Sequence, residues 1–303
     1  MTMTAVLFPG QGEQRPGMLH DLPAEGREVL DTARGALPDE PLSLDAVDAL
    51  NDTRATQLSL LLAGTAWYRA AVRLNLRADY LAGHSIGLWT AAVAAECLSL
   101  ADAVRLVDLR ATAMRAASPP GSGMLIVQGL AESAVEAAAA QARAEGRQVW
   151  SSNVNSATQI AASGTEGGLD RLADLVRDAG AQGVVRLDVL VPAHSPLMEP
   201  AADRVREAVA DITISRPRIP LAGNVTGQTL FTADAVRREL WRGIAHPVRW
   251  RDATSILAER EVTRWLQLPP GHALSRLASG CPEARTVAMG EIGLEESVRR
   301  MMR

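Results

Sequence analysis

The chain has few aromatic residues, few cysteines and no clustered positive charge. Aromatic residues make up 3% of the 303 positions, so Ala, Leu and Val must supply most of the core. The formal net charge is -4, and the arginines alternate with acidic residues along the chain instead of forming a block. Because nucleic-acid binding requires a clustered positive face, we expect no nucleic-acid partner.

The sequence also lacks the features of an exported or membrane protein. The two cysteines, Cys97 and Cys281, are too few for a disulfide framework and have no metal-ligand neighbours. The N-terminus, MTMTAVLFPG, has no basic segment and too short an apolar run for a signal peptide. No apolar run approaches the length needed to cross a bilayer. We therefore expect a cytoplasmic protein with no membrane partner.

Short apolar runs alternate with segments of helical periodicity along most of the chain. Residues 4–8 and 80–82 are typical of buried strands, and residues 56–74 and 100–117 are typical of helices. This alternation predicts an α/β fold with a large, parallel-sheet, hydrolase-like core covered on both faces.

The middle of the chain has a different pattern. Between residues 124 and 191 the expected order is strand, helix, strand, strand, helix, strand, which is typical of a ferredoxin-like unit. The last of these strands is expected over residues 184–191. We therefore predict a large catalytic domain from residues 1–123 and 192–303, with a small ferredoxin-like subdomain inserted at 124–191.

The sequence GHSIG at residues 83–87 matches the nucleophile-elbow pattern G-x-S-x-G. It directly follows an expected strand and precedes an expected helix, as an elbow requires. Such a turn presents the Ser85 hydroxyl at a helix N-terminus, where unpaired backbone N–H groups can stabilise an oxyanion. The alternative is a tight turn with a serine that only caps a helix.

A serine nucleophile needs a base, and His194 is the best candidate among five histidines. It ends an expected strand, and sites in parallel sheets gather at the carboxyl ends of strands. The group that would orient its imidazole stays open. Asp174, Asp178 and Asp188 lie between the serine and the histidine in the sequence, and a backbone carbonyl would also serve.

Two further positions carry possible chemistry. Arg110 follows Ala103 and Val107 on one apolar stripe of the helix expected at 100–117. Its guanidinium either extends to the surface or faces a cleft and binds a carboxylate. Gln11 lies between two glycines after the first strand, where its backbone N–H can approach a ligand or simply end the strand.

Taken together, these segments resemble the malonyl-CoA:acyl carrier protein transacylase family. The motifs FPGQG, GHSIG, LVDLRATAM, NVNSATQIAASG and VPAHSPLMEP occur in the family's order and spacing, over nearly the whole chain. The resemblance implies that Ser85 is acylated by malonyl-CoA with His194 as its base, and that the Gln11 and Ile86 amides form the oxyanion hole. It also implies that Arg110 binds the malonyl carboxylate and that no cofactor is tightly bound.

The family orients its histidine with a backbone carbonyl from an N-P-V-Q-W-like segment. That segment reads HPVRW here, so the resemblance assigns the orienting carbonyl to Arg249. The chain departs from the common family pattern at Leu88, where glutamate is usual, and at Ala111, where glycine is usual.

These departures, with PGMLHDLP, HPVRWRDAT and LPPGHALSRL, are similar to the branch that serves malonate decarboxylase as its epsilon subunit. That branch implies malonyl transfer to the prosthetic-arm thiol of a malonate decarboxylase carrier subunit, which is our first expectation. The alternatives are a transacylase for the acyl carrier protein of fatty acid or polyketide synthesis, an α/β-hydrolase-type esterase or thioesterase, and a non-catalytic subunit that docks a carrier.

Overall fold

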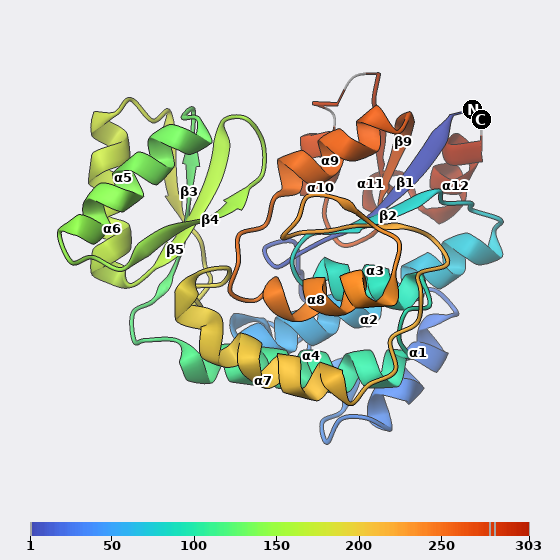
Figure 1. The fold of residues 1–303 in the computed structure, drawn as a ribbon. Helices are drawn as coiled ribbons and strands as arrows, with labels where there is room; N and C mark the ends of the chain where they lie inside the picture. Colours follow the sequence, from blue (N-terminus) through green and yellow to red (C-terminus); the bar gives the residue numbers. More distant parts are fainter. Residues whose placement is uncertain (1, 279, 282, 303) are drawn as a thin grey trace.

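Two β-sheets organise the chain, and they lie side by side in Figure 1. The computed structural model describes residues 2–278, 280–281 and 283–302. The larger sheet has the strand order β10-β9-β1-β2-β7-β8, and all its neighbouring strands are parallel except β7 and β8. Its strands are β1 (Met3–Phe8), β2 (Tyr80–Gly83), β7 (Leu221–Ala222), β8 (Thr229–Leu230), β9 (Val262–Gln267) and β10 (Arg285–Ala288).

Strand β1 shows why this sheet is covered on both faces. Val6 and Phe8 belong to the core on one face, which includes the helix α2 (Thr53–Arg73). Ala5 and Leu7 belong to the core on the other face, with residues of α9 (Trp250–Glu259). A strand buried on both faces needs a continuous apolar run, which the sequence of β1 provides.

Helices complete the two outer layers of the large sheet. In Figure 1, α9 and α10 lie on one side of β1 and β2, whereas α2, α3 and α4 lie on the other. Beyond α2 and α9, the helices of this part of the chain are α1 (Gly26–Arg34), α3 (Gly87–Ala94), α4 (Leu100–Ala117), α7 (Glu199–Ala210), α8 (Ala233–Arg242), α10 (Ala273–Ala278), α11 (Met289–Ile292) and α12 (Leu294–Met302), with short 3₁₀ turns η1 (Pro41–Ser43), η2 (Ala49–Asn51) and η3 (Pro196–Met198).

The smaller sheet is antiparallel and has the order β4-β5-β3-β6. Its elements follow one another as β3 (Gly123–Gln128), α5 (Glu132–Ala144), β4 (Val149–Val154), β5 (Gln159–Gly164), α6 (Glu166–Asp178) and β6 (Gly183–Arg186). Both helices cover the same face of the sheet, and this unit has its own apolar core. The chain thus has the expected α/β fold with a ferredoxin-like unit beside the parallel sheet.

One expected strand is shorter than its sequence indicates. A strand was expected over residues 184–191, but β6 ends at Arg186. Leu187 still donates its N–H to the carbonyl of Met124 in β3. The two strands are antiparallel, and β3 begins at Gly123, so β3 offers almost no further residues to pair with those after Leu187. The remaining apolar residues therefore have no strand to pair with, and Leu190 is 69% exposed.

Among the described residues, no helix is both long and apolar enough to cross a membrane. The two cysteines are free thiols, of which Cys97 is buried.

The division into two domains at residues 124 and 191 is a proposal. It is supported by the separate apolar cores of the large sheet and the small sheet. We expect Leu172→Ala to speed amide hydrogen exchange in β3–β6 and to leave the protection of β1 and β2 unchanged. Leu172 lies in the core of the small sheet, and such a truncation costs about 2–5 kcal/mol. The matched variant, Leu61→Ala in the large core, should act on the large sheet. Equal acceleration in both sheets after Leu172→Ala would contradict the division.

Candidate active site

Ser85 occupies the sharp turn between β2 and α3, and its backbone is left-handed with φ 54°. The two flanking residues must be glycines because there is no room for a side chain at either position. A Cβ on Gly83 would lie 2.0 Å from the backbone of Gly87, and one on Gly87 would lie 2.2 Å from the carbonyl oxygen of Phe8. Only glycine allows this close approach of strand and helix, so GHSIG forms the elbow that its pattern predicts.

The elbow brings Ser85 against His194, although 109 positions separate them. The hydroxyl oxygen Oγ of Ser85 lies 2.8 Å from Nε2 of His194. His194 is 3% exposed and also has a left-handed backbone, with φ 63°. The distance is that of a direct hydrogen bond, as a nucleophile and its general base require.

A backbone carbonyl, not a carboxylate, orients the imidazole. Nδ1 of His194 donates to the carbonyl oxygen of Gly243 at 2.6 Å, and this contact sets the tautomer that leaves Nε2 free to accept a proton. The expectation for Arg249 is wrong. Arg249 caps α9, and its carbonyl accepts the N–H of Ala253 in the first turn of that helix. The carbonyl that serves instead lies just after α8.

Burial keeps the His194 imidazole neutral. It lowers the pKa of His194 from 6.5 to about 3, and the charges of Arg110 and His84 act in the same direction. The carbonyl oxygens of Gly243 and His246 oppose this shift because they favour the protonated ring. A neutral imidazole is the form that can remove the Ser85 proton.

Arg110 faces the site and does not extend to the surface. Its side chain on α4 is 2% exposed, and Nη2 lies 3.4 Å from Oγ of Ser85. Nη1 donates to the side-chain oxygen of Gln57, while Nε has no hydrogen-bond partner in the described part of the chain. Burial lowers the pKa of Arg110 to about 10, which leaves it charged at neutral pH. No acidic side chain among the described residues pairs with it. A buried cation without a counter-ion favours an anionic ligand beside Ser85.

The Gln11 and Ile86 amides lie on the two segments that flank the serine. Gln11 is held by a hydrogen bond from Thr53 to its side-chain oxygen, at 3.1 Å, and a Cβ on Gly10 would lie 2.7 Å from the carbonyl oxygen of His84. Over the residues that the structure describes, neither amide N–H has a hydrogen-bond acceptor. Two unpaired donors next to a nucleophile are what an oxyanion hole requires.

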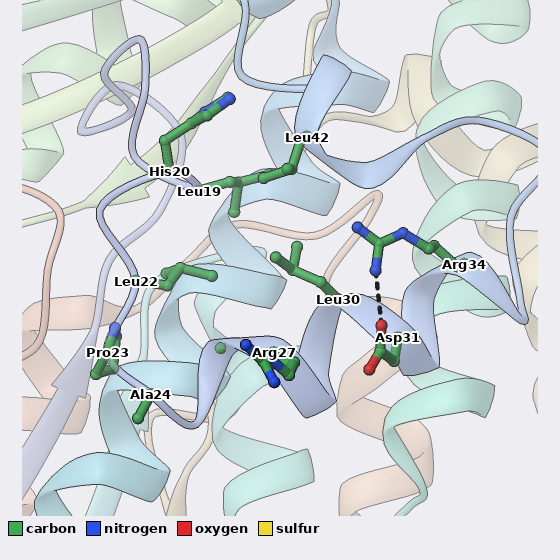
Figure 2. A pocket seen from close by; sticks show the side chains of 11 residues that line it. Leu19, His20, Leu22, Pro23, Ala24, Arg27, Leu30, Asp31, Arg34 and Leu42 are labelled. Atoms are coloured by element: carbon green, nitrogen blue, oxygen red, sulfur yellow. Dashed lines mark hydrogen bonds and ion pairs between the residues drawn. The ribbon is translucent and has the colours of Figure 1, made fainter.

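A cavity of about 430 Å³ opens onto the Ser85–His194 pair and Gln11, between the large sheet and the small one. Gln11, Ser85 and His194 line it from the large sheet, and Asn155 and Gln159 line it from the small sheet. A larger hollow of about 720 Å³ lies beside α1 (Figure 2). That hollow has a leucine-rich lining, and its Arg34 and Asp31 pair with each other. None of the described residues that line it form a serine–histidine pair, whereas Ser85 and His194 do so in the smaller cavity, which is therefore the candidate active site.

The sequence did not point to three residues that complete this site. Asn224 accepts the N–H of Ser85 and donates to the carbonyl of Gly83. Gln57 holds the Arg110 guanidinium, and Asn155 contacts the ring of His84 at 3.1 Å. The available signal for Asn224 was its position two residues after the short apolar run that forms β7, since sites gather at carboxyl ends of parallel strands.

No group of three or more His, Cys, Asp or Glu side chains that could hold a metal ion occurs among the described residues.

The fold and the site define a class of enzyme, and comparisons with known proteins identify the same class. The family model "Acyl transferase domain" matches residues 6–280. The chain belongs to this family and is an acyltransferase.

Within the family, the chain groups with the malonyl CoA-acyl carrier protein transacylases. It is 35% identical to that enzyme of Escherichia coli K12, over 95% of this chain and 96% of the relative. The Bacillus subtilis enzyme of the same name is 32% identical, over 91% of this chain and 90% of the relative.

Solved structures agree with this grouping. FabD from Acinetobacter baumannii superposes with a TM-score of 0.94 at 32% identity, over 99% of this chain and 98% of that one. A malonyl-transacylase solved in complex with its type II PKS acyl-carrier protein superposes with a TM-score of 0.88 at 32% identity, over 95% of this chain and 94% of that one.

The low pKa of His194 predicts how the reactivity of Ser85 depends on pH. A base is active in its neutral form, and a native pKa of about 3 keeps the imidazole neutral well below its ordinary value of 6.5. We expect the rate at which a fluorophosphonate labels Ser85 to change little between about pH 8 and about pH 5. Labelling followed by mass spectrometry measures this, with His194→Ala as the unreactive control. A rate that falls with a midpoint near 6.5 would show that His194 is not buried as described.

Proposed function

We propose that the protein transfers a malonyl group from coenzyme A to the thiol of a carrier-protein arm, through an ester on Ser85. The observation that carries this proposal is the buried, unneutralised guanidinium of Arg110, 3.4 Å from the Ser85 hydroxyl. A hydrolase of neutral esters has no use for a buried cation at its nucleophile. A dicarboxylic acyl group has a free carboxylate, which the guanidinium can bind through two charge-assisted hydrogen bonds.

The first half-reaction forms the ester. His194 removes the Ser85 proton as Oγ attacks the thioester carbonyl, whose oxygen becomes negatively charged. The amides of Gln11 and Ile86 donate to that oxygen, and each donor lowers the barrier by about 3 kcal/mol. The C–S bond then breaks, and the protonated His194 returns its proton to the sulfur of coenzyme A.

The second half-reaction runs the same steps with a new thiol. The thiol of the carrier arm gives its proton to His194 and attacks the Ser85 ester, and the serine oxygen leaves with that proton. The carrier therefore binds after coenzyme A has left, so the kinetics are ping-pong. The chemistry needs no resident cofactor, because malonyl-CoA arrives already activated as a thioester.

Two acceptors remain to be distinguished. The relatives are named for acyl carrier protein, and one solved relative is a complex with such a carrier. These comparisons favour an acyl carrier protein of fatty acid or polyketide synthesis over the malonate decarboxylase carrier that the sequence segments put first. We propose acyl carrier protein as the acceptor, with the cytoplasm as the site of action, and keep the decarboxylase carrier as the alternative.

The acyl-enzyme is the first test. Incubation with malonyl-CoA should increase the intact mass by one malonyl group, and Ser85→Ala should abolish the increase because it removes the attacking oxygen. The purified acyl-enzyme is then given an acyl carrier protein or a malonate decarboxylase carrier, each with its prosthetic arm attached. Faster loss of malonyl to the second carrier would reverse the proposed acceptor. A mass increase that persists in Ser85→Ala would overturn the mechanism.

Arg110 should decide which acyl groups are accepted. Arg110→Ala should lower kcat/KM for malonyl-CoA by about 10²-fold and leave kcat/KM for acetyl-CoA nearly unchanged, because only malonyl has a carboxylate to pair. Acylation rates with the two thioesters measure this.

The matched control for this prediction is Arg105→Ala, on the same helix. Arg105 is more than half exposed and pairs with Asp102 at the surface. An unchanged preference in Arg110→Ala would remove the arginine from carboxylate binding.

A further inference from the structure

Both residues of the Ser85–His194 pair have strained backbones. Each is a non-glycine residue in the left-handed region, with φ 54° and 63°. Such conformations cost about 1–3 kcal/mol each and persist only where neighbouring groups hold them. The groups that hold these two residues are both connected to α8 by hydrogen bonds or by the chain itself.

On the serine side, the holding group is Asn224. Its side-chain oxygen accepts the N–H of Ser85 at 2.7 Å, and its side-chain nitrogen donates to the carbonyl of Gly83 at 2.8 Å. Through these two hydrogen bonds, Asn224 connects Gly83 at the end of β2 to Ser85 at the turn. Asn224 is 2% exposed, so no water competes for them.

The loop that carries Asn224 is itself held by Glu239, a carboxylate on α8 that is 3% exposed. Its Oε2 accepts the N–H of Val225 at 2.8 Å. Its Oε1 accepts the N–H of Thr226 at 3.0 Å and the hydroxyl of Thr226 at 2.7 Å. No Arg, Lys or His side chain among the described residues forms an ion pair with this carboxylate, so three donors of one loop stabilise its charge.

On the histidine side, the holding groups follow α8 directly. The carbonyl of Gly243 accepts Nδ1 of His194 at 2.6 Å, and the carbonyl of Ile244 accepts its backbone N–H at 2.9 Å. Gly243 in turn donates its N–H to the carbonyl of Glu239 at 3.0 Å. One helix end therefore holds the base through its carbonyls and the nucleophile through Glu239.

We propose that Asn224 and Glu239 are positioning residues that set the distance between Ser85 and His194. With α8 and the Ser85–His194 bond they form a closed ring, which we call the α8 ring. Neither residue lines the cavity, and neither contacts Arg110, so the ring acts on the nucleophile and its base and not on substrate binding. This positioning role depends on the proposed malonyl transfer in one respect only, which is that Ser85 is the acylated group.

Three variants test the α8 ring. Asn224→Ala removes both bridges to the elbow, and Glu239→Gln keeps the shape but turns one acceptor into a donor. Thr226→Val removes the hydroxyl contact to Glu239 and the hydroxyl's long contact with the N–H of Gln228, at an exposed position, so it should fold even where the others do not. The matched control is Asp45→Asn. Asp45 is also a buried acid, and its side chain holds a loop by accepting the N–H of Leu19. Leu19 lines the hollow that Figure 2 shows.

Two rates are measured for each variant, namely fluorophosphonate labelling of Ser85 and single-turnover acylation by malonyl-CoA. We expect both to fall by about 10²-fold in Asn224→Ala, about tenfold in Glu239→Gln and about threefold in Thr226→Val, because small misplacements of reacting groups slow reaction steeply. The concentration of malonyl-CoA at half-maximal acylation should stay within about twofold, since the cavity and Arg110 are unchanged.

A double variant separates positioning from general destabilisation. If Asn224 and Glu239 act through one ring, their combination should label Ser85 no more slowly than Asn224→Ala alone, whereas Asn224→Ala with Asp45→Asn should show the Asn224→Ala rate multiplied by any small effect of Asp45→Asn. Labelling within twofold of wild type in all three ring variants would overturn the proposal, as would an equal loss in Asp45→Asn. Failure of malonyl acylation in the wild type would overturn the proposed function instead, while the labelling rates would still test the ring.

Discussion

The site depends on the close backbone approaches at the two glycines of the elbow, Gly83 and Gly87. The backbone of Gly87 passes so close to Gly83 that no side chain fits at Gly83, and the carbonyl of Phe8 leaves no room for a side chain at Gly87. Within this tight turn Ser85 has a left-handed backbone and lies just before α3. The free amide of Ile86 and the nearby Gln11 loop follow from the same geometry, because the loop after β1 packs on the elbow. A serine on a looser turn would have neither the donors nor the angle toward its base.

Around that elbow, the protein combines two kinds of buried polar group. The hydrogen bonds of Asn224 and the Gly243 carbonyl are satisfied, and they hold the nucleophile and the base in place. Arg110 is different, because it is buried and charged with one nitrogen unpaired. Buried groups with satisfied hydrogen bonds fix geometry, whereas a buried charge without a counter-ion favours an anionic ligand beside it. This contrast is what the proposed malonyl transfer requires, since that reaction needs a fixed serine–histidine geometry and a cation for the free carboxylate.

Much of the fold could be predicted, because periodicity reports burial directly. The strand β1, the elbow and the ferredoxin-like order all follow from local patterns. The expected strand at 184–191 ended early because strand length depends on a partner that local sequence does not show. The carbonyl that orients His194 was assigned to Arg249, but the first turn of α9 already uses it. Backbone carbonyls look alike in a sequence, so only their position in space identifies the one that serves.

The sequence by itself indicated the candidate nucleophile and its candidate base, and its family resemblance indicated the class of the enzyme, which the comparisons confirm. GHSIG, His194 and Arg110 are side-chain identities, and their chemistry is local. Only the tertiary structure decided that Arg110 turns inward to Ser85, that Asn224 holds the elbow, and that α8 connects the serine to the histidine. These facts join segments far apart in the chain, and such contacts depend on how helices pack against the sheet. Packing is a property of the whole fold, and no single segment carries it.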